Sequence, residues 1–375
     1  MKTTVLTKTV ILLAFSALVP IVCLVDSCRL AAGQGPHALS QIHGMHEFRA
    51  SHTATVLRDG RVLVAGGFKK GPDGRSQIYF QSAELFDPKT QSFTRAGDMK
   101  MRRAGHTATL LPDGKVLLAG GFTDQGMTSS AEIYDPISGT FSLIGPMSVP
   151  RGDFTATLLP NEDVLLAGGG SVGATASAEL FHPATNQFSS TGPLITPRVA
   201  HTATLLPNGN VLIVGGANNR IVLASAEIYN PESGSFTPAG TMKAPRYKHA
   251  AVLLKDGHVL IMGGSDERDW RGKYKSAEIY DWRPGKFTSI SDMVSQHFKF
   301  PGSVVQLGSG NILICGGCST VEMFSFLTKR FSPAARFDQP YYFGTASLLK
   351  DNSVLILGGY TENLQATDSA WLYSE

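Results

Sequence analysis

Cysteine is scarce in this chain, with four residues among 375. Disulfide-held scaffolds are rich in cysteine, so disulfides do not hold this fold together. Cys315 and Cys318 bracket a Gly-Gly pair, and the sequence leaves open whether they form a local disulfide after export. A catalytic redox pair is not expected, because such pairs lie at helix N-termini and these two flank the end of an expected strand.

Neither sign of charge dominates the chain. It has 33 lysines and arginines against 30 acidic residues, a net charge of +3 that is spread along the sequence. A nucleic-acid partner is therefore not expected. The sequence also lacks a recognisable Ser-His-Asp order, paired-carboxylate motif or phosphate-binding loop, so no catalytic residue is predicted.

Long apolar runs are confined to the N-terminus. The run Val10–Leu24 follows Lys2 and Lys8, contains Pro20 and precedes Ala31-Ala32. This pattern predicts a secretory signal peptide over residues 1–32, with an uncleaved membrane anchor as the alternative. We expect an exported monomer, periplasmic or extracellular, that meets a membrane only if this segment is retained.

The rest of the chain repeats one unit, which is clearest over 103–147. Apolar runs at 107–111, 115–119, 131–134 and 141–143 are separated by Pro, Gly and Asp turn signals, which predicts four short strands. Such a sheet would be apolar on both faces. It therefore needs copies of itself on either side.

A Gly-Gly pair marks the end of the second strand in every unit. The pairs stand at 66–67, 120–121, 168–169, 215–216, 263–264, 316–317 and 358–359. They are spaced by 42 residues (316 to 358) to 54 residues (66 to 120), a period typical of β-propellers. Glycine is expected where this strand turns beside the next blade, since a positive φ or a close backbone approach excludes a Cβ.

The seventh unit ends at Glu375 without a fourth strand. Leu39 and Met45 have the six-residue spacing that separates Phe141 from Met147 in a fourth strand. We therefore predict an all-β, seven-bladed propeller as a single domain over 39–375, its last blade closed by pairing residues 39–45 with 371–373. Closure removes the open sheet edges.

The pattern resembles the kelch-repeat propeller family, and in particular exported proteins of bacterial type. The resemblance covers about residues 39–375. It rests on the Gly-Gly pair, the downstream aromatic and the Arg-x-x-His-Thr-Ala start of strand one, as in Arg103–Ala108. It implies a propeller fold, and does not imply one function, because this fold carries many activities.

Charged residues recur at two positions of the unit. A basic residue lies three before the histidine position in units one to six, and a glutamate lies in the third strand of the same units; unit seven has Tyr341 and Trp371 instead. This joint loss favours an ion pair inside each blade. The predicted pairs are Arg49–Glu84, Arg103–Glu132, Arg151–Glu179, Arg198–Glu227, Arg246–Glu278 and Lys299–Glu322. The alternative is a basic ring that recruits an anion at the channel mouth.

The histidine position itself invites a metal hypothesis. It holds His52, His106, Phe154, His201, His249, Gly302 and Gly344. Equivalent positions of separate blades lie too far apart to ligate one metal ion. We expect packing and a hydrogen bond to a neighbouring backbone carbonyl, and no metal or cofactor.

Recognition is expected on the face that carries the loops after Gly-Gly, because variable loops on a rigid scaffold carry most binding sites. Aromatic and arginine side chains make good anchors for a protein or a sugar. The candidate binding residues are Phe68, Lys69, Arg75, Tyr79, Arg268, Trp270, Arg271, Tyr274, Tyr341, Tyr342 and Tyr360. The sequence thus favours a protein- or carbohydrate-binding module.

Two enzyme alternatives rest on resemblance. The segment 244–257 is similar to units of galactose-oxidase-like copper enzymes, which implies a tyrosine crosslinked to a cysteine, a Tyr-His neighbour pair and a further histidine. This chain has no Tyr-His dipeptide, since Lys248 separates Tyr247 from His249. Its cysteines within the propeller are only Cys315 and Cys318. A sugar mutarotase or epimerase on a kelch propeller is the other alternative.

Overall fold

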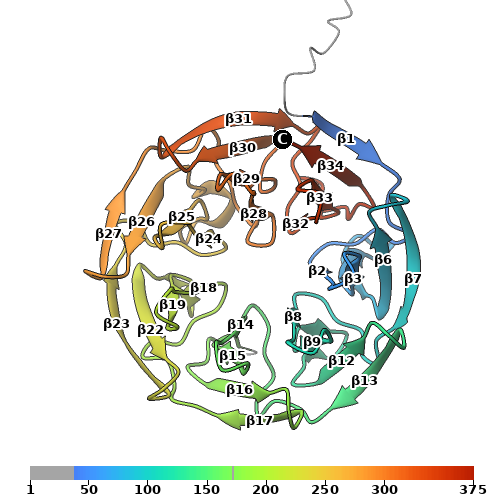
Figure 1. The fold of residues 1–375 in the computed structure, drawn as a ribbon, viewed down its shortest axis with the longest axis horizontal. Coiled ribbons are helices and arrows are strands. Elements are labelled where there is room, and N and C mark those ends of the chain that lie inside the picture. Colours follow the sequence, from blue (N-terminus) through green and yellow to red (C-terminus); the bar gives the residue numbers. More distant parts are fainter. Residues whose placement is uncertain (1–37, 171–172) are drawn as a thin grey trace, which may run out of the picture. The chain divides into compact units, whose positions relative to one another are not determined.

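The repeats form a closed ring of seven four-stranded antiparallel sheets (Figure 1). The structure is a computed structural model, and it describes residues 38–170 and 173–375. The predicted signal or anchor at 1–32 lies outside the described residues. Within the described part of the chain, no helix is long and apolar enough to cross a membrane.

Blades 1 to 3 follow the chain in order from the axis outward. Blade 1 consists of β2 (Thr53–Val56), β3 (Val62–Ala65), β6 (Ser82–Asp87) and β7 (Ser92–Asp98). Blade 2 consists of β8 (Thr107–Leu110), β9 (Val116–Ala119), β12 (Ala131–Asp135) and β13 (Thr140–Ile144). Blade 3 consists of β14 (Thr155–Leu158), β15 (Val164–Ala167), β16 (Ala178–His182) and β17 (Gln187–Ser190).

Blades 4 to 6 repeat this order, and blade 7 takes its outer strand from the other end of the chain. Blade 4 consists of β18 (Thr202–Leu205), β19 (Val211–Val214), β22 (Ser225–Asn230) and β23 (Ser235–Thr241). Blade 5 consists of β24 (Ala250–Leu253), β25 (Val259–Met262), β26 (Ala277–Asp281) and β27 (Lys286–Ser289). Blade 6 consists of β28 (Val304–Gln306), β29 (Ile312–Ile314), β30 (Thr320–Ser325) and β31 (Arg330–Arg336). Blade 7 consists of β32 (Thr345–Leu348), β33 (Val354–Leu357), β34 (Ala370–Ser374) and β1 (Ala38–Ile42).

Ring closure is therefore as predicted, with a shorter N-terminal strand. β1 pairs antiparallel with β34, and Leu39 lies opposite Tyr373. The predicted strand extended to Met45, but the chain leaves the sheet after Ile42 and Met45 packs into the core between blades 7 and 1. Met45 thus belongs to the segment that leads into blade 1 rather than to the strand.

A substitution in β1 tests whether closure contributes to stability. Leu39 is half-buried and packs on the core between blades 6 and 7. We expect Leu39→Ala to lower the free energy of unfolding by about 1–2 kcal/mol, because the buried part of the leucine side chain is lost. The loss is smaller than for a fully buried leucine, because part of this side chain is exposed. The matched control is Ile137→Ala, since that side chain is 97% exposed and should change little. Equal midpoints of denaturation for the two variants would contradict a stabilising role for β1.

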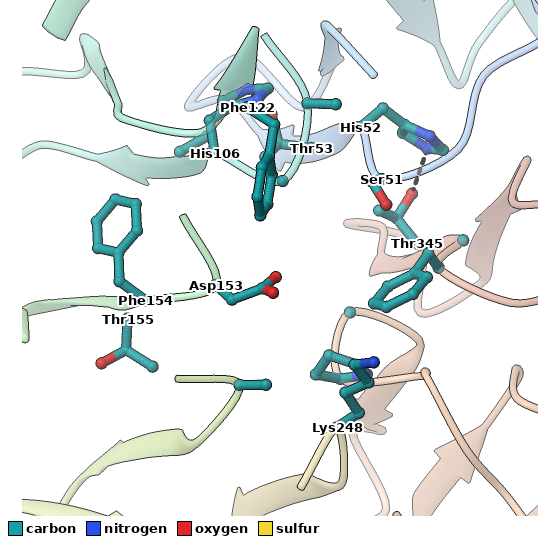
Figure 2. A pocket seen from close by; sticks show the side chains of 18 of the residues that line it. Ser51, His52, Thr53, His106, Phe122, Asp153, Phe154, Thr155, Lys248 and Thr345 are labelled. Atoms are coloured by element: carbon teal, nitrogen blue, oxygen red, sulfur yellow. Dashed lines mark hydrogen bonds between the residues drawn. The ribbon is translucent and has the colours of Figure 1, made fainter. Parts of the chain in front are cut away.

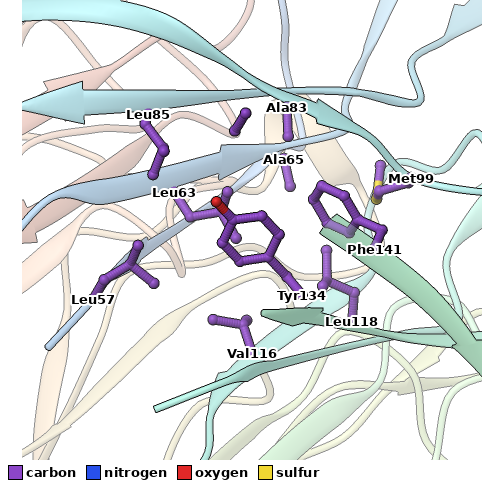
Figure 3. Packing of buried hydrophobic residues seen from close by; sticks show 11 residues of the cluster. Leu57, Leu63, Ala65, Ala83, Leu85, Met99, Val116, Leu118, Tyr134 and Phe141 are labelled. Carbon is purple, nitrogen blue, oxygen red and sulfur yellow. The ribbon is translucent and has the colours of Figure 1, made fainter. Parts of the chain in front are cut away.

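Each pair of neighbouring blades shares one apolar core. Leu63 and Ala65 of β3 pack with Val116 and Tyr134 of blade 2 (Figure 3). The alternate residues Val62 and Val64 of the same strand pack against blade 7. Since side chains alternate across a strand, a strand that is apolar throughout is buried on both faces, as the sequence predicted.

The Gly-Gly pair makes this close packing possible. Gly66 has φ of +63°, and a Cβ on it would come within 2.4 Å of the backbone oxygen of Arg103 in the next blade. Gly67 donates its N–H to that same oxygen at 2.9 Å. A side chain at Gly66 would therefore force two blades apart, as the sequence argument expected.

Five of the six predicted ion pairs are present inside their blades. Their guanidinium-to-carboxylate contacts join Arg49 to Glu84, Arg103 to Glu132, Arg151 to Glu179, Arg198 to Glu227 and Arg246 to Glu278. In blade 2, Arg103 Nη2 lies 2.9 Å from Glu132 Oε1, and both side chains are fully buried. The glutamate also accepts the backbone N–H groups of Lys100 and Met101, which belong to the turn between blades 1 and 2. Each pair thus fixes that turn as well as its own blade.

The sixth predicted pair, Lys299–Glu322, is wrong. Glu322 pairs with His297, whose Nε2 lies 2.9 Å from Glu322 Oε1. His297 lies 19 positions before Gly316, whereas Arg246 lies 17 positions before Gly263, so two residues are inserted before β28. Counting back from the glycines therefore assigned Lys299 to the arginine position and Gly302 to the histidine position, and both assignments are two residues too late. Counting four residues forward from Met293, as from Met99 to Arg103, gives His297.

Blade 7 replaces the ion pair with aromatic packing. The ring centroids of Tyr341 and Trp371 lie 4.7 Å apart, and both rings also contact Phe337. The joint loss of cation and anion in the sequence thus reflects one substituted contact.

Candidate functional site

One residue of each blade lies beside the central channel, two residues before the first strand in six blades and five residues before β28 in blade 6. These residues are Ser51, Gly105, Asp153, Ala200, Lys248, Lys299 and Phe343, here called the mouth ring. All have φ between +51° and +60°. This left-handed conformation is uncommon for residues other than glycine, so the surrounding structure must hold it.

Backbone hydrogen bonds provide that support by linking the mouth ring from blade to blade. Ser51 N–H donates to Phe343 O at 2.9 Å, Gly105 N–H to Ser51 O at 2.8 Å, and Ala200 N–H to Asp153 O at 2.8 Å. Three more such bonds run from Lys248 to Ala200, from Lys299 to Lys248 and from Phe343 to Lys299. The chain thus fixes its backbone around the channel and leaves the side chains of this ring free to vary.

The loops after Gly-Gly rise beside the mouth ring. Single bridges pair Ala50 with Phe68, Ala104 with Phe122, and Val199 with Ala217. The loops contain three small hairpins: β4 (Phe68–Lys70) with β5 (Gln77–Tyr79), β10 (Phe122–Thr123) with β11 (Gly126–Met127), and β20 (Ala217–Asn218) with β21 (Ile221–Val222). The 3-10 helix η1 (Asp269–Arg271) lies in the corresponding loop of blade 5. The predicted shared face is therefore present.

A cavity of about 640 Å³ lies between these elements. Its wall includes Ser51, Asp153, Lys248 and Phe343 of the mouth ring, together with Phe122 from the β10–β11 hairpin. Figure 2 shows the Asp153 carboxylate and the Phe122 ring pointing into the open centre. The cavity thus combines opposite charges, hydroxyl groups and aromatic rings.

Asp153 is the carboxylate of this cavity. Its side chain has no hydrogen-bond donor among the described residues, and it is half-buried. Burial raises its pKa, against the opposing effect of Lys248 and Lys299. Lys248 Nζ lies 4.0 Å from Asp269 Oδ1 and 4.7 Å from the centre of the Tyr247 ring. A polar ligand could therefore satisfy an acceptor that the protein leaves unused.

An aromatic cluster borders one side of the mouth. It consists of Tyr79, Phe68, Tyr360, Phe343, Tyr342, Trp270, Phe298 and Tyr247, each of which contacts another member. Lys299 lies within it, with Nζ 4.0 Å from the centre of the Trp270 ring and 5.0 Å from that of Phe298. Burial lowers the pKa of Lys299 to about 8. Cation–π contacts thus replace the carboxylate that the sequence assigned to this lysine.

The four histidines of the repeat bind the preceding blade. Their Nε2 atoms lie 3.0–3.1 Å from threonine hydroxyls, pairing His52 with Thr345, His106 with Thr53, His201 with Thr155 and His249 with Thr202. The expected partner was a backbone carbonyl, so that detail of the prediction is wrong. Burial, assisted by the neighbouring arginines, lowers the pKa of His52 and of His201 to about 3. These rings are therefore neutral at pH 7.

The sequence of this chain was compared with models of known protein families. The model of the kelch motif matches residues 49–100, 102–148 and 198–243, which are blades 1, 2 and 4. The chain is a seven-bladed propeller that contains kelch motifs.

Two curated proteins are similar to parts of this propeller. Galactose oxidase of Gibberella zeae is 30% identical over 90 residues, which are 24% of this chain and 13% of that protein. The tRNA wybutosine-synthesizing protein 4 of Saccharomyces cerevisiae is 35% identical over 77 residues, 20% of this chain and 10% of that protein. The chain thus spans only about an eighth or less of these relatives, and their activities do not transfer with the match.

A solved structure shares the kelch propeller fold. It is a fungal alcohol oxidase of the AA5 family in complex with copper, with a TM-score of 0.75 and 17% identity. The match covers 91% of this chain and 76% of that one. At this identity the likeness concerns the fold alone.

The described residues do not fit a copper centre. They contain no group of three His, Cys, Asp or Glu side chains that could hold a metal ion. The channel histidines direct Nε2 to separate threonines, and Cys315 is buried in the core between blades 6 and 7. We therefore derive no step through copper.

Ten of the eleven candidate binding residues fall into three groups. Phe68 and Tyr79 line the cavity. Trp270, Tyr342 and Tyr360 belong to the aromatic cluster, where Tyr342 and Tyr360 are 1% and 6% exposed. The third group lies on the outer loops: Lys69 over Phe80, Tyr274 against Arg246, Arg268 paired with Asp266, and Arg75 and Arg271 exposed.

The prediction that Tyr341 binds a ligand is wrong. It occupies the arginine position of blade 7 and is 4% exposed inside the core, so it cannot bind a ligand on the loop face. Sequence reasoning also missed Asp153, Lys248 and Phe122. The sequence did contain a sign of this site, because the residue just before the histidine position varies from unit to unit while the residues around it recur. Its left-handed φ gives it a special direction that residue type alone does not reveal.

Proposed function

We propose that this kelch propeller is an exported binding module that takes a carbohydrate in the mouth cavity. The observation that carries the proposal is the Asp153 carboxylate, which points into the cavity without a donor among the described residues. Sugar hydroxyls are donors that would satisfy it. The nearby Lys248 ammonium could donate to ring or hydroxyl oxygens.

The walls and size of the cavity support a small polyhydroxylated ligand. Ligand pockets commonly enclose roughly 300–1,000 Å³, and this cavity of about 640 Å³ falls within that range. Phe122 lies against the backbone of blade 3, since a Cβ on Gly152 would meet its ring at 2.8 Å. Phe122, Phe68 and Tyr79 offer flat apolar surfaces for the C–H faces of sugar rings. A concave site of this kind suits a glycan better than a flat protein epitope.

Export is part of the proposal because of the N-terminal sequence, which has lysines followed by an apolar run. We further propose a monomer that binds no nucleic acid, consistent with the small net charge of +3.

Loss of the Asp153 carboxylate should weaken glycan binding. We expect Asp153→Asn to weaken binding of the best glycan from an array about 10- to 100-fold, because hydrogen bonds to a charged group contribute about 1.5–3 kcal/mol. Isothermal titration calorimetry measures the change. Asp113→Asn is the matched control, since this exposed carboxylate lies in the turn between β8 and β9 at the opposite end of the blade.

Equal binding by wild type and Asp153→Asn would contradict the mouth site. If no glycan binds but a protein partner does, and Phe68→Ala or Tyr79→Ala weakens that binding, the face is a protein-binding surface instead. Copper analysis after loading tests the oxidase alternative, and stoichiometric bound copper would contradict our assignment of the donor set.

A further inference from the structure

Blade 6 differs from its neighbours on the loop face. It has His297 where five blades have arginine, and its loop after Gly-Gly is reduced to Cys318 and Ser319 before β30 begins at Thr320. Cys318 is a free thiol and is half-buried. The substituted cation and the cysteine therefore occur together in one blade.

The geometry around His297 identifies a protonated imidazole. Nδ1 lies 2.6 Å from the carbonyl oxygen of Gly316, and Nε2 lies 2.9 Å from Glu322 Oε1. Both acceptors require a proton on the facing nitrogen. Burial by itself would lower the pKa of His297, but the contacts to Cys318 and Glu322 outweigh it and raise that pKa to about 10.

The Cys318 sulfur lies directly against this imidazolium. Sγ is 3.5 Å from His297 Nε2 and 3.7 Å from Nδ1. The backbone N–H of Thr320 points at Sγ from 3.3 Å, and Thr320 O, at 3.4 Å, would accept a hydrogen bond only from a protonated thiol. Tyr342 is a further titratable group near Cys318, and burial raises its pKa to about 12, so it is neutral.

Cys315 provides the contrast within the same blade. It is 1% exposed in an apolar core, and burial raises its pKa. It lacks a basic neighbour among its described contacts. Two cysteines three residues apart thus have opposite environments.

We propose that Cys318, whose sulfur is held against the His297 imidazolium, is a nucleophile that forms a mixed disulfide with small-molecule disulfides. The Cys318 sulfur attacks one sulfur of R–S–S–R, the new Sγ–S bond forms as the S–S bond breaks, and RS⁻ leaves and is protonated by solvent. The cysteine sulfur is oxidised, and the departing sulfur is reduced. His297 keeps its proton, which Glu322 and Gly316 O hold in place. A cysteine beside a histidine cation can react in this way, because the cation stabilises negative charge on the sulfur.

The test is the pH profile of Cys318 modification in the full chain. The probe is 5,5′-dithiobis(2-nitrobenzoate), and peptide mass spectrometry follows the Cys318 mixed disulfide at each pH. An ordinary thiol with a pKa of about 8.5 loses roughly 80-fold in thiolate between pH 8 and pH 6. We expect the rate at Cys318 to fall by much less than this factor over that range, because the adjacent imidazolium stabilises negative charge on Sγ.

Variants separate activation from mere exposure. His297→Gln, confirmed as folded by circular dichroism, should slow modification at pH 6 more than about tenfold and restore the ordinary pH profile. Cys315→Ser should leave the rate at Cys318 unchanged. A wild-type profile with a midpoint near 8.5, or no modification of Cys318 in the folded chain, would overturn the proposal even if His297→Gln does not fold.

Discussion

Replacing Arg103 by methionine is expected to lower the free energy of unfolding by about 3–5 kcal/mol, because it leaves the buried Glu132 carboxylate without its cation. The guanidinium also donates to Gly120 O at 2.7 Å and to Ser130 O at 3.1 Å, so two carbonyl groups lose a donor as well. Chemical denaturation monitored by tryptophan fluorescence measures the change.

An exposed ion pair supplies the control for Arg103. Arg61 and Asp59 form a pair at 2.7 Å whose side chains are 36% and 45% exposed, and Arg61→Met should cost at most about 1 kcal/mol. The double variant Arg103→Met with Glu132→Gln should recover part of the loss, because the uncompensated buried charge is then absent. A stable Arg103→Met chain with impaired ligand binding would instead support the basic-ring hypothesis.

Stability should fall steeply in mild acid, because the folded chain holds its channel histidines neutral. For His52 and His201 the pKa in the folded chain is about 3, below the ordinary value of 6.5. Above pH 6.5 the rings are neutral in both states. Between pH 6.5 and pH 3 only the unfolded chain binds the proton, so acid favours unfolding. Each of these two histidines should lower the free energy of unfolding by roughly 2 kcal/mol between pH 6.5 and pH 5, since one pKa unit corresponds to about 1.4 kcal/mol.

His297 has the opposite effect on the pH dependence of stability. Its raised pKa contributes stability that is present below pH 6.5 and is lost as pH rises toward about 10. The histidines together therefore place the stability maximum near pH 6.5. Unfolding free energies from denaturant titrations between pH 5 and pH 9 trace both limbs.

The sequence itself suggests the variant that tests the acid limb. Phe154 occupies the histidine position of blade 3, so the site accepts an apolar ring. His201→Phe should reduce the difference in unfolding free energy between pH 7 and pH 5 by roughly 2 kcal/mol. If wild type and His201→Phe lose equal stability over this interval, the buried histidine is not the cause.

The ring architecture could be predicted because each part of it leaves a periodic mark. Gly66 and its equivalents are required where neighbouring blades approach closely. The joint change to Tyr341 and Trp371 indicates a contact inside one blade. The position of His297 was missed because two inserted residues shifted the count from the glycines. The correct register depends on the turn after Met293, which the insertion does not disturb.

The candidate site was harder to predict, because it depends on direction rather than on residue type. Asp153 lies at an ordinary sequence position, and only its φ of +51° directs it to the channel. Tyr341 and Tyr342 are neighbours in sequence, yet one packs in the core between blades 6 and 7 and the other joins the aromatic cluster. Alternation of side chains places such neighbours on opposite sides, and loop composition alone cannot assign them.

A crystal structure of the domain with its best-binding oligosaccharide tests the proposed site most directly. We expect a sugar ring in the cavity beside the mouth ring, with a hydroxyl group within hydrogen-bond distance of the Asp153 carboxylate and a ring face against Phe122. A sugar bound on the outer loops, for example at Arg75 or Arg271, with the mouth cavity holding only solvent, would contradict it.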